Sequence, residues 1–196
     1  MSSEEFKNKE ILLEIMKEEF SVFQSILLRD GRLPLIFRLY GRDNQVHHIQ
    51  FEEVSDESKP KISELIRLAC VANDIWGLTS GFEAWMAEPG GRPSLNPDRK
   101  EAFVHVGSWV ERDGSILTYL LPYLIERNAD GDIIDLQEAD RPPEPTQESK
   151  GHLAHLLPTE RPTLKERRDA RQAFNKLMKR ATRGHESGVV PRKKLH

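Results

Sequence analysis

Cysteine, aromatic residues and long apolar runs are all scarce in this sequence. The 196 residues include a single cysteine, Cys70, so no disulfide forms within the chain and a disulfide scaffold is excluded. No run of about 18 apolar residues occurs, which excludes a membrane-spanning helix. The hydrophobic fraction of 37% is low beside a charged fraction of 31%, and this balance indicates that part of the chain stays solvated.

The N-terminal residues also lack the pattern of a secretion signal, because Glu4 and Glu5 stand where a signal peptide is basic and then apolar. We therefore expect a cytoplasmic protein. Cys70 lies between Ala69 and Val71 in a helical pattern, which predicts a buried and unreactive thiol rather than a nucleophile.

Charge is divided unevenly along the chain. Residues 161–196 hold 12 lysines and arginines against 3 acidic residues, a net charge of +9, whereas residues 1–160 carry −12. The near-neutral total therefore hides an acidic body joined to a basic tail. Such asymmetry indicates an electrostatic partner, which is either another molecule or the protein's own body.

Apolar periodicity and turn residues predict three helices and six strands. Helical spacing predicts a long first helix that Gly31 ends, and Asp-Gly turns predict hairpins. In order, the expected elements are a helix over 4–28, strands over 33–40 and 46–51, a helix from Pro60 to Asn73, strands over 78–87, 101–110, 115–126 and 133–136, and a helix after Thr163. Pro122 removes one ladder donor, so the end of its strand is expected at a sheet edge.

These elements predict an α+β fold, with an antiparallel or mixed sheet of five to six strands and two helices on one face, plus a basic C-terminal helix. We expect the core domain over 1–140 and a proline-rich linker over 141–160. The basic amphipathic helix and a disordered tail follow over 161–196. Removal of that tail should leave the fold intact.

Common catalytic signatures are absent. There is no phosphate-binding P-loop and no dinucleotide fingerprint, so the sequence predicts no cofactor. The segment 77–81 has its serine one place too late for a nucleophile elbow, and we interpret it as a turn or a bulged strand start. His47 and His48 face opposite sides of a strand, and His152 and His155 have no acidic neighbours at useful spacing, so no metal site is predicted.

The densest group of polar residues comprises Glu83-Ala84-Trp85-Met86 and, after a loop, Pro97-Asp98-Arg99-Lys100-Glu101-Ala102. This pair of segments resembles a group of uncharacterised bacterial and phage proteins, over roughly residues 35–136. The resemblance implies the same order of elements and a phage or mobile-element origin, and it implies no activity.

Two interpretations of this group follow from strand geometry. In the first, Glu83 and Arg99 form a structural ion pair that holds the intervening loop. In the second, Glu83, Asp98 and Glu101 form a carboxylate cluster that performs acid/base chemistry with His105 as a proton carrier, or that binds a metal ion.

The basic helix also has competing interpretations. Its apolar residues Phe174 and Leu177 predict docking on a protein surface, either the acidic body or an acidic partner. Alternatively its basic residues contact nucleic-acid phosphates without sequence specificity. The residues expected to bind are Arg167, Arg168, Arg171, Phe174, Leu177, Lys179 and Arg180. A half-alanine apolar face argues against a membrane surface.

The sequence therefore predicts a small binding or regulatory module that acts through protein contacts of its acidic body and basic tail, and an enzyme is the less favoured alternative.

Overall fold

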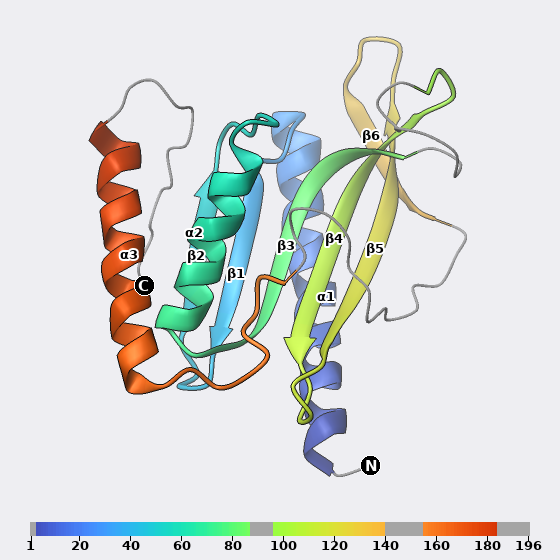
Figure 1. The fold of residues 1–196 in the computed structure, drawn as a ribbon. Coiled ribbons are helices and arrows are strands. Elements are labelled where there is room, and N and C mark those ends of the chain that lie inside the picture. Colours follow the sequence, from blue (N-terminus) through green and yellow to red (C-terminus); the bar gives the residue numbers. More distant parts are fainter. Residues whose placement is uncertain (1–2, 87–95, 140–154, 184–196) are drawn as a thin grey trace.

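The computed structural model describes residues 3–86, 96–139 and 155–183, and within these ranges it describes side chains from Lys9 to Lys179. Its elements in chain order are α1 (Ser3–Asp30), β1 (Leu35–Gly41), β2 (Val46–Phe51), α2 (Lys59–Ala72), β3 (Ile75–Met86), β4 (Lys100–Val110), β5 (Ile116–Arg127), β6 (Ile133–Glu138) and α3 (Leu164–Arg183). Figure 1 shows their arrangement. No described helix is long and apolar enough to cross a membrane.

The six strands form one sheet in the order β2-β1-β3-β4-β5-β6, and every neighbouring pair is antiparallel. The predicted α+β fold is therefore confirmed, with three helices and a C-terminal helix that packs against α2. The predicted hairpin turns are also present. Asn44, Gly114 and Gly131 adopt positive φ angles of 63°, 84° and 89° in the three turns, where asparagine and glycine are favoured.

Local sequence explains the ends of the two shorter helices. Pro60 stands in the first turn of α2, where its missing N–H costs nothing. At the other end the side-chain amide of Asn73 donates to the carbonyl of Ala69. Before α3, Thr163 and Glu166 form a capping box, in which the backbone N–H of each residue is bonded to the side chain of the other.

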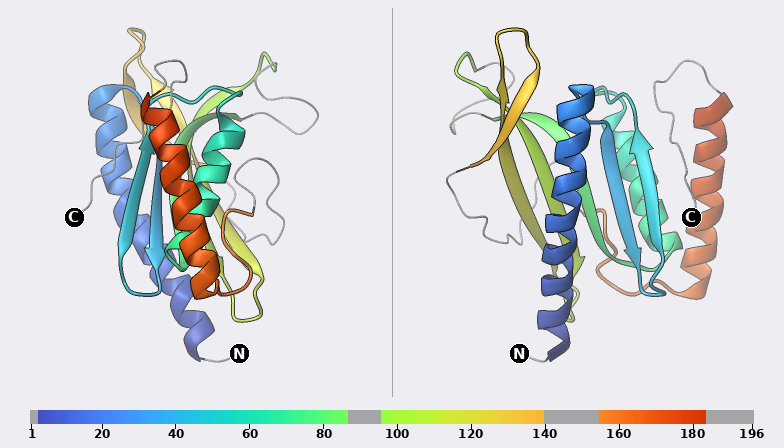
Figure 2. Two further views of the ribbon diagram at one scale, coloured as in Figure 1. Left: turned by 60° about the vertical axis from the view of Figure 1, so that its left-hand side comes forward. Right: turned by 180° about the vertical axis from the view of Figure 1, so that it is seen from behind.

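The expectation that two helices share one face of the sheet is wrong, because α1 and α2 lie on opposite faces. Ile36 of β1 packs with Phe23 of α1, whereas the next residue, Phe37, packs with α2. Adjacent strand residues point to opposite sides, so the two helices bury opposite faces. The right-hand view of Figure 2 shows α1 crossing one face, while α2 and α3 lie beyond the other.

Glycines in the centre of the sheet let α1 approach closely. Gly81 of β3 and Gly107 of β4 lie beneath the helix, and a Cβ atom at Gly81 would stand 3.0 Å from the Phe23 ring. The predicted turn at 77–81 is therefore wrong, since these residues form the middle of a strand. The register shift of β3 lies just before this segment, where Tyr40 pairs with Gly77 and Gly41 pairs with Ile75.

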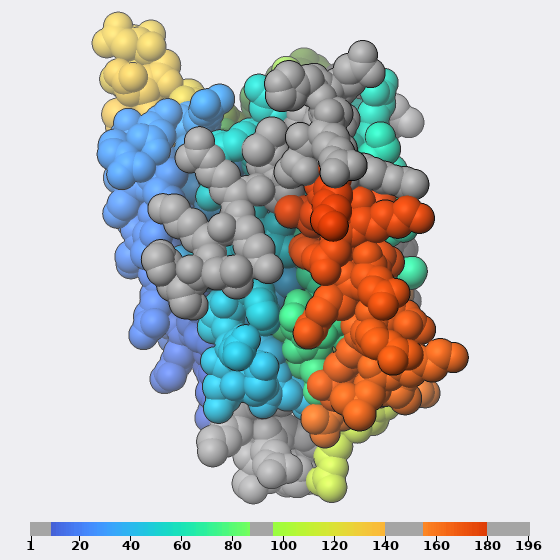
Figure 3. Space-filling model, turned by 90° about the vertical axis from the view of Figure 1, so that its left-hand side faces the viewer, coloured from blue at the N-terminus to red at the C-terminus, as the bar shows by residue number. Residues whose placement is uncertain are grey.

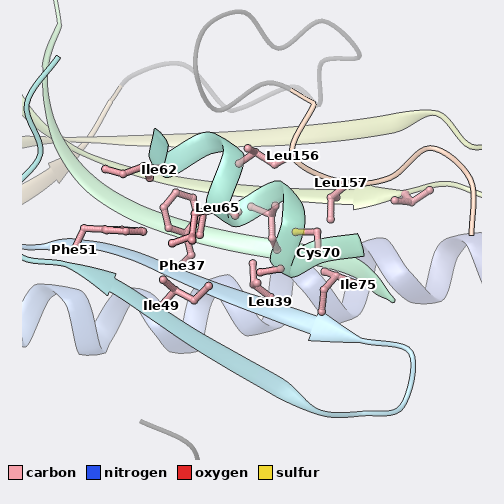
Figure 4. Packing of buried hydrophobic residues seen from close by; sticks show 14 residues of the cluster. Phe37, Leu39, Ile49, Phe51, Ile62, Leu65, Cys70, Ile75, Leu156 and Leu157 are labelled. Carbon is pink, nitrogen blue, oxygen red and sulfur yellow. The ribbon is translucent and has the colours of Figure 1, made fainter. Parts of the chain in front are cut away.

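The core on the other face joins β1, β2 and β3 to α2 (Figure 4). Cys70 is fully buried there, and burial raises the pKa of its thiol, so the predicted inert cysteine is confirmed as buried. Leu156 and Leu157 belong to the same cluster. The end of the expected linker over 141–160 is therefore packed against the body, while residues 140–154 lie outside the described part of the chain.

Candidate functional site

Helix α3 docks on the body through its apolar side. Phe174, Leu177 and Met178 pack against the core cluster that contains α2, and Ala170 is buried. The left-hand view of Figure 2 shows α3 lying alongside α2. The sequence left open whether the tail contacts an external partner or its own body, and the structure shows that the helical part contacts the body.

A buried carboxylate anchors the start of this helix. Asp74, directly after α2, accepts one hydrogen bond from Arg161 at 3.0 Å, and Arg167 lies 2.9 Å from the same oxygen. Arg42 approaches the other oxygen at 3.7 Å. Arg171 then donates to the carbonyl of Ala72 at the C-terminus of α2, where a cation is favoured by the helix dipole. Apolar packing and contacts of the arginines thus both hold α3 on the body.

A cavity of about 510 Å³ opens beside this anchor. Arg42, Asp74 and Arg161 line one side, and the β4–β5 turn, including Arg112 and Asp113, lines another. The walls of the cavity therefore carry charged groups of both signs.

The opposite side of α3 is exposed and basic. We call Lys165, Arg168, Lys176 and Lys179 the outer stripe. These residues follow one another at spacings of three, eight and three, which place them on one side of the helix, and all four are exposed. At 1.5 Å per residue the outer stripe is about 20 Å long. Figure 3 shows α3 at the surface beside α2, with its outward side uncovered over most of its length.

The expected binding residues therefore divide into two groups. Phe174, Leu177, Arg167 and Arg171 are used for docking on the protein's own body. Arg168 and Lys179 belong to the outer stripe, and Arg168 lies 3.9 Å from Asp169 on the same helix. The side chain of Arg180 lies outside the described part.

The second candidate site is the end of β3 and the start of β4, where two of the predicted carboxylates meet. Glu83 accepts a hydrogen bond from the backbone N–H of Leu33, and Glu101 forms two hydrogen bonds with Arg127 at 2.6 and 2.7 Å. Burial raises the pKa of Glu83, and the nearby Glu101 charge raises it further. The hydrogen bond from Arg127 lowers the pKa of Glu101.

The other predicted members of that site lie elsewhere. Arg99 places its guanidinium carbon 4.3 Å from the centre of the Trp85 ring, a cation–π contact. Asp98 is exposed in the turn before β4. The Glu83–Arg99 ion pair stays a prediction. The contacts described here are those of Glu83 with the backbone of Leu33 and of Arg99 with the Trp85 ring.

His105 lies on the α1 side of the sheet in a separate cluster, in which His105 itself is fully buried. Its Nε2 atom is 3.0 Å from Glu19 of α1, and Tyr40 donates to the same carboxylate at 2.6 Å. Arg38 lies 3.0 Å away and completes the group. Glu19 is 1% exposed and His105, the expected proton carrier, is fully buried.

Sequence analysis missed Glu19 and Asp74. Glu19 joins α1 to one face of the sheet, and Asp74 anchors the start of α3 on the other side. Glu19 sits at a buried helical position between Met16 and Phe23, and a charged residue in an apolar stripe is the signal that indicates a partner. Asp74 carried no comparable signal, since it follows the helix in a short polar turn. Among the described residues, no group of three or more metal-ligating side chains converges.

The comparisons with known proteins give no relative. No family model matches the chain, and no curated protein or solved structure matches it. Function is therefore argued from the geometry alone, and the resemblance of the Glu-Ala-Trp-Met and Pro-Asp-Arg-Lys-Glu-Ala segments to bacterial and phage proteins stays a prediction.

Proposed function

We propose that the protein is a binding module that recognises an acidic surface of a partner protein through the outer stripe of α3. The observation that carries this proposal is the division of α3 into two sides. The apolar side is buried on α2, which fixes the helix, and the outer stripe remains exposed on that rigid support. A fixed row of cations loses less conformational freedom on binding than a free basic arm does.

A protein partner suits the distribution of charge better than a nucleic acid does. Residues 1–160 carry −12, so a long polyanion that reaches the outer stripe is repelled by much of the remaining surface. The aromatic residue of the helix, Phe174, is packed inward and offers no stacking platform for unpaired bases. A protein surface can present acidic groups at the stripe alone.

The test is a triple charge reversal, Lys165→Glu, Arg168→Glu and Lys176→Glu. The matched control, Lys17→Glu, Arg32→Glu and Lys100→Glu, makes the same change of net charge at exposed positions away from α3. Each full-length chain is used as bait in a nuclease-treated lysate of the native host, and captured proteins are identified by mass spectrometry and then purified for direct binding. We expect wild type and control to bind the same acidic protein and the stripe variant to lose it.

The nucleic-acid alternative is tested in parallel with a synthetic DNA duplex. Contact with Z phosphates gives a slope of about −0.9Z in log K against log salt. A steep slope that disappears in the stripe variant, together with loss of all capture after nuclease treatment, would overturn the proposal in favour of nucleic acid. Equal capture by the stripe variant and wild type would also overturn it.

A further inference from the structure

The cavity beside the start of α3 has the size of a small-molecule site. Its volume of about 510 Å³ falls within the range of roughly 300–1,000 Å³ that is typical of ligand pockets. Four segments meet around it: the turn after β1, the junction of α2 and β3, the turn between β4 and β5, and residues 158–162, which lead into α3. Figure 1 shows all four at the lower end of the sheet.

Contacts between these segments fix the shape of the cavity. The backbone N–H of Arg42 donates to the carbonyl of Asp74, which joins the turn after β1 to the end of α2. Gly114 has a φ of +84°, and a Cβ atom there would stand 2.6 Å from the carbonyl oxygen of Thr159. Residues 158–162 therefore approach the β4–β5 turn more closely than a residue with a side chain at position 114 would allow. Walls that are already ordered lose little conformational freedom when a ligand binds.

Two arginines on one wall have N–H donors that no described residue uses. Arg42 and Arg161 both approach the carboxylate of Asp74 through Nε, at 3.7 and 3.0 Å. Among the described residues, none accepts a hydrogen bond from the Nη atoms of either arginine. The two side chains are 40% and 67% exposed. A guanidinium presents its donors in a planar fork that matches the paired oxygens of a carboxylate or a phosphate.

The carboxylate of Asp74 does not balance the positive charge at this wall. Arg167 lies 2.9 Å from Asp74 in addition to Arg42 and Arg161, so three guanidinium groups surround one buried carboxylate. Arg112, on the facing turn, lines the cavity as well. The wall formed by Arg42, Asp74 and Arg161 is therefore positively charged.

The other acidic lining residues are turned away from this wall or stand at the surface. Glu111 accepts a hydrogen bond from the indole of Trp109. Because Trp109 packs against α1 and Val110 packs on the opposite face, the carboxylate of Glu111 lies toward the α1 face. Asp113 accepts a backbone N–H within its own turn, and both Asp113 and Glu160 are exposed.

The remaining lining includes apolar groups. Ile75 and Val110 are buried side chains of the sheet, and Pro158 and Pro162 belong to the segment that leads into α3. Such groups contact a carbon skeleton favourably and make no demand for hydrogen bonds. A ligand that suits both parts of the cavity therefore combines an anionic group with an apolar body.

We propose that this cavity binds a small organic anion, a carboxylate or a phosphate monoester on an apolar body, through Arg42 and Arg161. The anionic oxygens accept hydrogen bonds from the Nη donors, and the body contacts Ile75 and Val110. A carboxylate and a phosphate share the chemistry that a guanidinium recognises, and the experiment distinguishes them.

Nuclear magnetic resonance of the full-length, ¹⁵N-labelled chain tests the site with four probes that share a phenyl ring. Benzoate and phenyl phosphate are the anions, benzyl alcohol is the neutral probe and benzylamine is the cation, all at constant ionic strength in a buffer without phosphate. We expect at least one anion to shift the amide signals of Arg42, Ile75 and Gly114 saturably, while benzyl alcohol and benzylamine leave them unchanged. Tighter binding of benzoate identifies a carboxylate site, and tighter binding of phenyl phosphate identifies a phosphate site.

Arg42→Gln and Arg161→Gln should each weaken binding of the tighter anion about tenfold, the factor expected for loss of a charge-assisted hydrogen bond. Arg32→Gln makes the same change of charge at an exposed position outside the cavity and is the matched control. Arg42→Gln is the variant more certain to fold. Its 3.7 Å contact with Asp74 is longer than a hydrogen bond, and Arg161 and Arg167 still pair with that carboxylate.

The absence of a saturable shift with both anions would overturn the proposal, as would equal shifts with benzylamine. Unchanged affinity in Arg42→Gln, or an equal loss of affinity in Arg32→Gln, would also overturn it. These variants leave the outer stripe of α3 intact, so capture of an acidic partner persists when anion binding is lost. The test of this cavity and the test of the proposed function therefore fail separately.

Discussion

At the residue scale, Glu19 is the charged group on which the α1 face depends. A carboxylate that is 1% exposed must be paired, because removal of a charge from water costs several kcal/mol. Glu19 bonds His105 of β4 and Tyr40 of β1 and lies beside Arg38, which is also in β1. It therefore fixes the position of α1 over β1 and β4 as well as the side chains that it contacts.

Glu19→Gln should lower the free energy of unfolding by about 3 kcal/mol, near the lower end of the range for breaking a buried ion pair, since Arg38 keeps partial access to water. Urea unfolding measures this loss. Glu18→Gln, at the exposed neighbouring position, is the control and should change stability by less than about 0.5 kcal/mol. Equal effects of the two substitutions would contradict a structural role for Glu19.

The same group predicts an acid-sensitive component of stability. Burial opposes ionisation of Glu19, but hydrogen bonds from His105, Tyr40 and Thr79 and the charge of Arg38 outweigh it and hold its pKa below the ordinary 4.5. Its stabilisation is therefore present above pH 4.5 and is lost as the pH falls through the lower, folded pKa. The difference between wild type and Glu19→Gln should shrink over that acidic range in unfolding measured at successive pH values.

At the scale of elements, α1 depends on glycines for its distance from the sheet. Gly81→Ala places a methyl group 3.0 Å from Phe23 and 3.1 Å from Phe103, both rigid rings, so we expect a loss of about 1–3 kcal/mol in thermal or urea unfolding. Gly77→Ala is the matched control on the same strand. Its Cβ atom has no neighbour closer than 3.6 Å, so the change should be neutral or slightly stabilising.

If the two glycine substitutions destabilise the protein equally, contact of the added methyl group with Phe23 and Phe103 does not explain the loss at Gly81. A larger loss in Gly81→Ala alone supports the close packing of α1.

The elements themselves were predictable, whereas their assembly was not. Alternation and helical spacing located each helix and strand, because local periodicity reports which residues are buried. That periodicity does not say which face of the sheet a helix covers, so α1 and α2 were placed together. Gly77 and Gly81 suggested a turn for the same reason, since only the packed helix shows why a strand centre needs glycine.

The candidate site was predictable in part. The amphipathic pattern of α3 identified Phe174 and Leu177 as docking residues, and the structure places both against the core. Long-range polar pairs were not predictable. His105 and Glu19 are 86 residues apart, and Asp74 meets Arg161 across 87 residues, so spacing carries no information about either contact. Strand geometry suggested a cluster of Glu83, Asp98 and Glu101 with His105, whereas in the structure Asp98 is exposed in a turn and His105 bonds Glu19.

At the scale of the whole molecule, part of the basic tail is bound by the protein's own body. Arg161, Arg167 and Arg171 contact Asp74 and the end of α2, and the apolar side of α3 covers part of the core. Removal of residues 161–196 is therefore expected to expose apolar surface, contrary to our expectation from sequence that the body would be unaffected.

Proteolytic cleavage of the linker tests whether α3 stays docked on the body without a covalent connection to it. Residues 141–150 contain three prolines and no apolar side chain, so a broad-specificity protease should cut there first. We expect the two fragments to elute together in gel filtration without denaturant, because Phe174, Leu177 and Met178 keep the C-terminal fragment packed on the body. They should separate only after addition of urea.

The double variant Phe174→Ser and Leu177→Ser is the matched comparison for this experiment. It removes two apolar contacts of α3, while Met178, the buried Leu156 and Leu157 and the ion pair of Arg167 with Asp74 remain. After the same cut, its C-terminal fragment should therefore dissociate at a lower urea concentration than the wild-type fragment, and at a still lower one as salt is raised. Dissociation of both fragments at the same urea concentration would show that Phe174 and Leu177 do not hold α3, whereas separation of the wild-type fragments without urea would show that the C-terminal fragment is held only by its connection to the chain.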